Sequence, residues 1–280
     1  MKTILFASDF STNSNVALHY ALYFAKTSGA RLIVNTIFDA SIFLVSETES
    51  AVYPEIDEKI LAINSEKLKR QIEHITAEWK SGVQIIEDVT EHTSIVGGLV
   101  DLVEKHHADL VVLGSKGDQS ITEKIFGSTT TGMIGEAICP VLVIPHDATF
   151  RPIEKIVYAS AMDQGDFAAT AFLAKIVNSL HASLHFIHLA DGKNENELLE
   201  FDQFSDLLLD TTTLTNVQIE LQTSQSFEEG LLFYLEEEKA DLLVMLERKE
   251  SNFFARLFHR DHVKEMSHLT TIPLLSIPKK

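Results

Sequence analysis

The chain has 280 residues, of which 45% are hydrophobic and 23% are charged, as in globular proteins that bury a core. At roughly 150 residues per domain, this length predicts two domains. The net charge of −18 argues against nucleic acid and anionic membranes as partners, because both favour basic surfaces.

The single cysteine and the first residues of the chain indicate the cellular compartment in which the protein is expected. The lone Cys139 excludes an intrachain disulfide and fits a reducing environment, and its apolar neighbours predict a buried, unreactive thiol. The N-terminus leads directly into a strand pattern without the features of a signal peptide, and no apolar run is long enough to span a bilayer. We therefore expect a cytoplasmic protein.

In the first half, short apolar runs alternate with longer amphipathic stretches. The runs predict strands at 3–8, 31–37, 83–87, 109–113 and 141–144, and the stretches predict helices at 13–27, 56–80, 95–106 and 128–138. The first helix has a cap candidate at Ser11 and a glycine stop at Gly29. The strands are continuously apolar, which is typical of parallel strands covered on both faces.

Two glycine clusters flank the loop between the fourth strand and the fourth helix. The strand runs to Leu113, Gly114 and Gly117 follow it, and Gly127 precedes Ser128 and Thr129 at the helix start. Glycine lets a backbone approach a ligand closely, and the free amides of a helix N-terminus form a natural phosphate site. The pattern fits a nucleotide cradle, although an ordinary surface loop with turn glycines is the alternative.

The second half repeats the first. The segments 155–160, 240–245 and 273–278 echo 2–8, 108–113 and 140–145 in the same order, and the halves join between Pro145 and Pro152. Strands are predicted at 154–159, 183–189, 217–221, 241–245 and 274–277, and helices at 166–180, 196–210, 227–238 and 261–268. The fold class predicted is α/β, with two tandem, doubly wound, Rossmann-like parallel sheets in domains 1–146 and 152–280.

In such sheets, ligands bind outside the carboxyl ends of the strands. Asp9 ends the first strand, Ile37 ends the second and Gly114 follows the fourth, so these three positions are expected to converge on one crevice.

These residues resemble the universal stress protein family in its tandem form. Its nucleotide signature, Gly-x2-Gly-x9-Gly-Ser/Thr, is matched by Gly114, Gly117, Gly127 and Ser128, and Asp9 matches the family's aspartate after the first strand. The resemblance implies a fold like that of adenine nucleotide alpha hydrolases and an ATP-binding module that regulates stress responses through unidentified protein partners. It also implies a pseudo-dimer joined through the last strands of the halves, and a homodimer is a further option.

The resemblance also implies roles for individual residues in holding ATP, with or without Mg²⁺. The glycines and Leu113 bring backbone to the phosphates, and Ser128, Thr129 and Thr130 offer hydroxyls to the outer ones. Ile37 packs on the base. Asp9 serves the adenine, the ribose or a cation, because a carboxylate repels phosphate; a simple cap or turn role is its alternative.

The second half departs from this signature. The positions of Gly114, Gly117 and Gly127 are taken by Leu246, Lys249 and His259, and that of Asp9 by Ala161. We therefore expect the second domain not to bind ATP in this way.

Enzymatic motifs are missing from the sequence. We find no Walker motif, dinucleotide fingerprint, nucleophile elbow or Cys-x-x-Cys, and no general base besides Asp9 at a strand end. No catalytic residue is assigned and no metal ligand set is identified. An ATP-binding regulator is the leading hypothesis, with a slow ATPase and a scaffold carrying a vestigial nucleotide site as alternatives.

Overall fold

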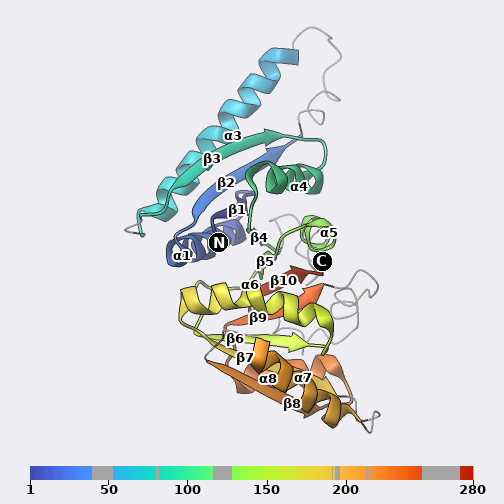
Figure 1. Cartoon of the computed structure of the whole chain (residues 1–280). Coiled ribbons are helices and arrows are strands. Elements are labelled where there is room, and N and C mark those ends of the chain that lie inside the picture. The colour runs from blue at the N-terminus through green and yellow to red at the C-terminus, as the bar shows by residue number, and fades with distance from the viewer. Residues whose placement is uncertain are drawn as a thin grey trace. The chain divides into compact units, whose positions relative to one another are not determined.

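The computed structural model describes residues 1–39, 53–79, 82–115, 128–190, 192, 196–211, 214, 216–247 and 272–279. The chain divides into two compact units, Met1–Ile144 and Pro145–Lys280 (Figure 1). Among the described residues, no helix is both long enough and apolar enough to cross a membrane.

The first unit is a parallel sheet with helices on both faces. Its strands are β1 (Thr3–Ala7), β2 (Arg31–Phe38), β3 (Ile85–Glu91), β4 (Leu110–Gly114) and β5 (Val141–Ile144), arranged in the order β3-β2-β1-β4-β5. Its helices are α1 (Thr12–Ser28), α3 (Tyr53–Thr76), α4 (Ile95–His106) and α5 (Ser128–Glu136). Helix α1 contacts α3, and α4 contacts α5, so the helices form two covering layers.

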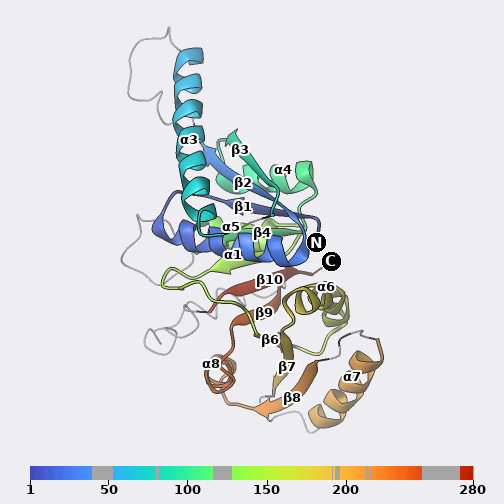
Figure 2. The same ribbon diagram turned by 90° about the vertical axis from the view of Figure 1, so that its left-hand side faces the viewer.

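The second unit repeats this plan. Its strands are β6 (Lys155–Ser160), β7 (Ser183–Ala190), β8 (Val217–Thr223), β9 (Leu242–Glu247) and β10 (Leu274–Pro278), in the order β10-β9-β6-β7-β8. The helices are α6 (Gln164–Leu180), α7 (Glu197–Thr211) and α8 (Phe227–Glu237). Helices α6 and α7 lie on one face of this sheet and α8 on the other (Figure 2). The helix predicted at 261–268 lies outside the described residues.

The predicted fold class, two tandem doubly wound parallel sheets, is confirmed. Most predicted elements agree with the structure to within three residues at each end. Two elements are exceptions: the helix expected at 56–80 ends at Thr76, and the strand expected at 83–87 extends to Glu91. The acidic residues in the second half of β3 made its end hard to predict. The strand is the outer one of its sheet, and most of its residues are only half-buried. The continuous apolar pattern expected of central strands is therefore absent there.

The ends of α1 are fixed as the sequence predicts. The Ser11 side chain accepts a hydrogen bond from the Ser14 amide, and Gly29 adopts a left-handed conformation with φ of 67° that ends the helix. Farther along the chain, Cys139 is free and buried, and burial raises the pKa of its thiol to about 12. The thiol is thus neutral and unreactive at physiological pH.

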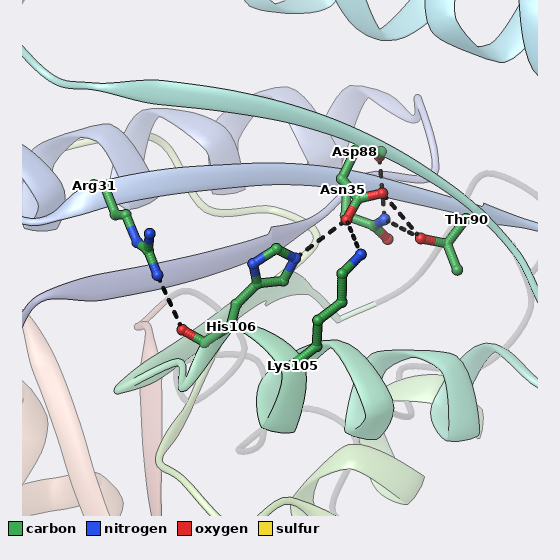
Figure 3. Close-up of polar contacts among 6 residues, drawn as sticks. All are labelled: Arg31, Asn35, Asp88, Thr90, Lys105 and His106. Carbon is green, nitrogen blue, oxygen red and sulfur yellow. Dashed lines mark hydrogen bonds and ion pairs between the residues drawn. The ribbon is translucent and has the colours of Figure 1, made fainter.

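A polar cluster fixes the edge of the first sheet to α4 (Figure 3). Asn35, which is fully buried on β2, donates to the Asp88 carbonyl at 3.1 Å and to the Thr90 hydroxyl at 3.0 Å on β3. Asp88 in turn pairs with His106 at 3.3 Å and Lys105 at 3.5 Å at the C-terminal end of α4. These contacts hold the C-terminal end of α4 against β3.

Candidate nucleotide-binding site

The strand order brings the three predicted strand-end positions together. Because β2, β1 and β4 are neighbours, Asp9, Ile37 and Gly114 lie at the same edge of the sheet on adjacent strands or directly after them. Such an edge is where ligands bind in doubly wound sheets. The sequence therefore placed these residues correctly relative to the sheet.

The turn after β1 is held rigidly by its own side chains. The Asp9 carboxylate accepts a hydrogen bond from the Ser11 amide at 3.0 Å, and Phe10 takes a left-handed φ of 61°. The Ser8 hydroxyl donates to Gln71 of α3 at 2.6 Å and accepts from the Phe10 amide at 3.1 Å. Asp9 thus has the turn role named as its alternative, and its side chain is nevertheless exposed at the sheet edge.

Ile37 lies beneath α4. A β-carbon added to Gly98 of α4 would come within 2.9 Å of the Ile37 side chain, so the helix approaches this strand end closely. Ile37 is only half-buried, which leaves part of its apolar surface free for a flat ring to pack against.

Gly114 is required by packing as well as by any ligand. A β-carbon at this position would lie 2.5 Å from Nδ2 of Asn13, a buried side chain on α1 that donates to the Ile144 carbonyl at 3.3 Å. Leu113 before it is buried in the core, so only its backbone can serve a ligand. The Ser115 amide donates to the Ile144 carbonyl at 2.8 Å and is therefore not available to a phosphate.

The start of α5 faces the end of β4. Ser128 is exposed and Thr129 half-buried in the first turn, whose amides have no partner inside the helix. Thr130 has a different role from the one expected, because its hydroxyl donates to the carbonyl oxygens of Gly114 at 3.1 Å and Ser115 at 3.3 Å. This bond ties α5 to the strand. Gly117 and Gly127 lie outside the described residues.

The donor set suits a nucleotide. Free amides and the Ser128 hydroxyl at a helix N-terminus attract phosphate, the half-buried Ile37 offers an apolar surface, and Asp9 offers a carboxylate for hydroxyl or amino groups. Within the described parts of the chain, no group of three or more His, Cys, Asp or Glu side chains could hold a metal ion.

The second unit packs the corresponding strand end differently. Leu246 takes the place of Gly114, and Gly165 takes the place of Asn13 on the adjoining helix. A β-carbon on Gly165 would lie 2.6 Å from a methyl group of Leu246. The two units therefore use opposite solutions: a small strand residue against a large helix residue in the first, and the reverse in the second.

This exchange predicts a strong coupling between Gly165 and Leu246. Gly165→Asn should destabilise the second unit by about 1–3 kcal/mol, because the added side chain has no room beside Leu246. In the Gly165→Asn/Leu246→Gly double variant, the two changes should offset each other by at least about 1 kcal/mol in a urea-unfolding cycle. Strictly additive effects would show that the two positions do not compensate.

A buried carboxylate lies at the same end of the second unit. Asp166 is fully buried and accepts hydrogen bonds from the Tyr158 hydroxyl, from the Ser160 hydroxyl at 2.9 Å and from the Asp163 amide at 2.9 Å. Lys279 pairs with Asp163 at 3.1 Å at the same place. These buried groups are thus partnered with one another.

Glu247, the last residue of β9, is an unusual acid. Its Oε2 atom is buried without a hydrogen-bond partner among the described residues, and burial raises the pKa of its carboxyl from 4.5 to about 7. The protonated form is therefore favoured in the folded state. Stability from this group is fully present below pH 4.5 and is lost as the pH rises through 7.

Replacing this acid should remove that pH dependence. Glu247→Gln is expected to raise the melting temperature of the second unit by a few degrees at pH 8 and to leave it unchanged at pH 4.5, since glutamine resembles the neutral acid. Differential scanning calorimetry across this range checks the prediction. An equal shift at both pH values would contradict it.

The chain matches the universal stress protein family model over residues 1–145. Universal stress proteins MJ0531 and MJ0577 of Methanocaldococcus jannaschii are 28% and 24% identical to it over 148 and 156 residues, each covering 51% of this chain and 81% and 94% of their own length. The crystal structure of a universal stress protein from Archaeoglobus fulgidus superposes with a TM-score of 0.65 at 16% identity, covering 99% of this chain and 96% of that one.

The fold and the sheet edge therefore define a tandem pair of Rossmann-like α/β units. The family match covers just over half of the chain. This protein belongs to the universal stress protein family.

Several residues that shape this site were missed by the reading of the sequence. Gln71 reaches it from α3, and Gly98 and Gly132 let α4 and α5 pack closely; a β-carbon on Gly132 would lie 2.7 Å from Val96. The glycines could have been noticed inside helical patterns, where they are unfavourable without a packing reason. Nothing in its local pattern marks Gln71, since it is one of several polar residues on a long helix.

Proposed function

We propose that the protein is a cytoplasmic, ATP-binding regulator of stress responses. Its first unit holds the nucleotide and its second unit does not. One observation carries the proposal. The signature Gly-x2-Gly-x9-Gly-Ser begins at Gly114, at the carboxyl end of β4 beside β1, and ends at Ser128, the first residue of α5. This is the position at which doubly wound sheets bind phosphates.

Each part of the nucleotide has a matching group in this proposal. The phosphates lie against the glycine-rich backbone and the start of α5, where Ser128 and Thr129 add hydroxyls. The base packs on Ile37, and Asp9 accepts from the ribose or adenine, or holds Mg²⁺. ATP supplies negative charge at this edge, and its presence or absence is the signal that partner proteins detect.

The second unit supports the assignment by contrast. Gly114, Gly117 and Gly127 of the signature are replaced by Leu246, Lys249 and His259, so the second unit lacks the glycine backbone that the proposal requires. Association of the two halves through residues 141–144 and 274–277 stays a prediction from the sequence, and the proposed ATP binding does not depend on it.

Isothermal titration of the full chain with ATP tests the proposal. We expect one ATP per chain. Absence of heat and of a thermal shift at millimolar ATP would leave the scaffold hypothesis. Phosphate release well above the buffer background that is abolished by Asp9→Asn would instead identify a slow ATPase, since Asp9 is the one acid assigned to this edge.

A further inference from the structure

Helix α7 of the second unit exposes large apolar side chains. Leu198, Leu199, Leu207 and Leu209 are between 51% and 60% exposed, although leucine is usually buried. We call Leu198, Leu199 and Leu209 the outer leucines of α7; Leu207, nine residues after Leu198, lies on the opposite side of the helix. Helix α7 flanks β8 of the second unit (Figure 2).

The outer leucines are not needed to hold α7 in place. The helix is fixed through its other side: Leu208 is fully buried, and the Phe204 ring lies 5.0 Å from that of Phe167 on α6. At its start, Glu197 pairs with His188 of β7 at 3.1 Å. The outer leucines are therefore available to a partner without disturbing the fold.

The charge on α7 is of one sign. The helix carries five carboxylates, Glu197, Glu200, Asp202, Asp206 and Asp210, and no Lys, Arg or His. Helix α3 holds the corresponding place in the first unit and also exposes apolar residues, Leu61 at 42% and Ile63 at 55%. It carries Lys59, Lys67, Lys69 and Arg70 among its acids, so α3 lacks this bias.

The spacing places acids between leucines on the same face. Leu198, Asp202 and Leu209 are separated by four and seven residues, which brings them onto one line of the helix. Leu198 and Leu209 are about 16 Å apart along the axis at 1.5 Å per residue, or three turns. A complementary surface must be apolar, must carry positive charge between its apolar groups and must extend about three turns.

We propose that the outer leucines of α7 bind a basic amphipathic helix of a partner protein. Leucines in the partner pack against them, and lysines or arginines meet the carboxylates of α7, as in other helix–groove complexes. A second copy of this chain is a poor fit, because two α7 helices would bring carboxylates of the same sign together. An anionic membrane is repelled for the same reason.

A designed peptide tests the proposal. The probe is a fluorescein-labelled helix of roughly 18 Leu and Lys residues at helical spacing, followed by anisotropy on the full chain at about 0.15 M salt. We expect saturable binding that Leu198→Ser/Leu209→Ser weakens at least about tenfold. Asp202→Lys/Asp206→Lys should weaken binding by a similar factor. The affinity of the wild-type chain for the peptide should fall as the salt concentration is raised.

Matched variants make the test specific. Leu61→Ser/Ile63→Ser on α3 removes comparable exposed apolar surface and should leave the affinity unchanged, and unaltered far-UV circular dichroism confirms that all variants are folded. Equal binding to the wild type and both α7 variants overturns the proposal, as does an equal loss with the α3 variant. Concentration-dependent dimers that disappear in Leu198→Ser/Leu209→Ser would overturn it in favour of self-association.

Discussion

Gly117→Val is expected to abolish ATP binding, with a loss of affinity of at least about a hundredfold, while the fold is kept. A branched side chain in the middle of the Gly-x2-Gly-x9-Gly-Ser signature places methyl groups where the backbone must approach phosphate. Gly117 comes three residues after the end of β4 in the sequence, so the substitution falls outside that strand. Isothermal titration with ATP measures the affinity.

The control is the same substitution at a glycine with open surroundings. Gly82 precedes β3, and a β-carbon there would meet no atom within 4 Å, so Gly82→Val should bind ATP like the wild type. Trp79 is the one tryptophan of the chain and belongs to the first unit, so its fluorescence reports whether that unit is folded in each variant. Wild-type affinity in Gly117→Val would remove the basis of the assigned site.

Asp166→Ala is expected to destabilise the second unit by about 3–5 kcal/mol. The carboxylate is fully buried and satisfies three donors, so its removal leaves the hydroxyls of Tyr158 and Ser160 buried without an acceptor. That loss is a large part of the stability of a domain of this size. Urea unfolding followed by far-UV circular dichroism should show an early transition from this unit.

Two further measurements separate this explanation from a general loss of stability. The Trp79 fluorescence transition, which reports the first unit, should stay near its wild-type midpoint. Tyr158→Phe added to Asp166→Ala should recover part of the loss, because it removes one of the orphaned hydroxyls. If the double variant is no more stable than Asp166→Ala, the buried hydroxyl is not the source of the penalty.

The two halves of the chain share a fold and a turn after the first strand, although their local packing differs. Ser8 and Ser160 hold the same turn, since each accepts a hydrogen bond from the amide two residues later, and Phe10 and Met162 both take a left-handed conformation. The two copies differ beyond this shared turn. Ser14 in the first unit is replaced by the buried Asp166 in the second. The Asp166 carboxylate accepts hydrogen bonds from the Ser160 hydroxyl and the Asp163 amide.

Local pattern was enough to predict the elements and their order. Apolar runs such as 110–113 and 141–144 predict buried parallel strands, because each run is apolar on both faces of the strand. The glycine stop at Gly29 and the cap at Ser11 are likewise local, since each depends on the conformation of a few residues. The outer strand β3 was placed poorly because its half-buried residues follow no continuous apolar pattern.

The sequence by itself thus determined two doubly wound units, the strand ends at which Asp9, Ile37 and Gly114 converge, and the absence of the glycine signature from the second half. Only the tertiary structure showed that Gly114 packs against Asn13 and Leu246 against Gly165. It also showed that the Thr130 hydroxyl donates to a carbonyl at the end of β4. Such pairings join residues far apart in the chain. They follow from which side chains share a limited volume, and no local period records that.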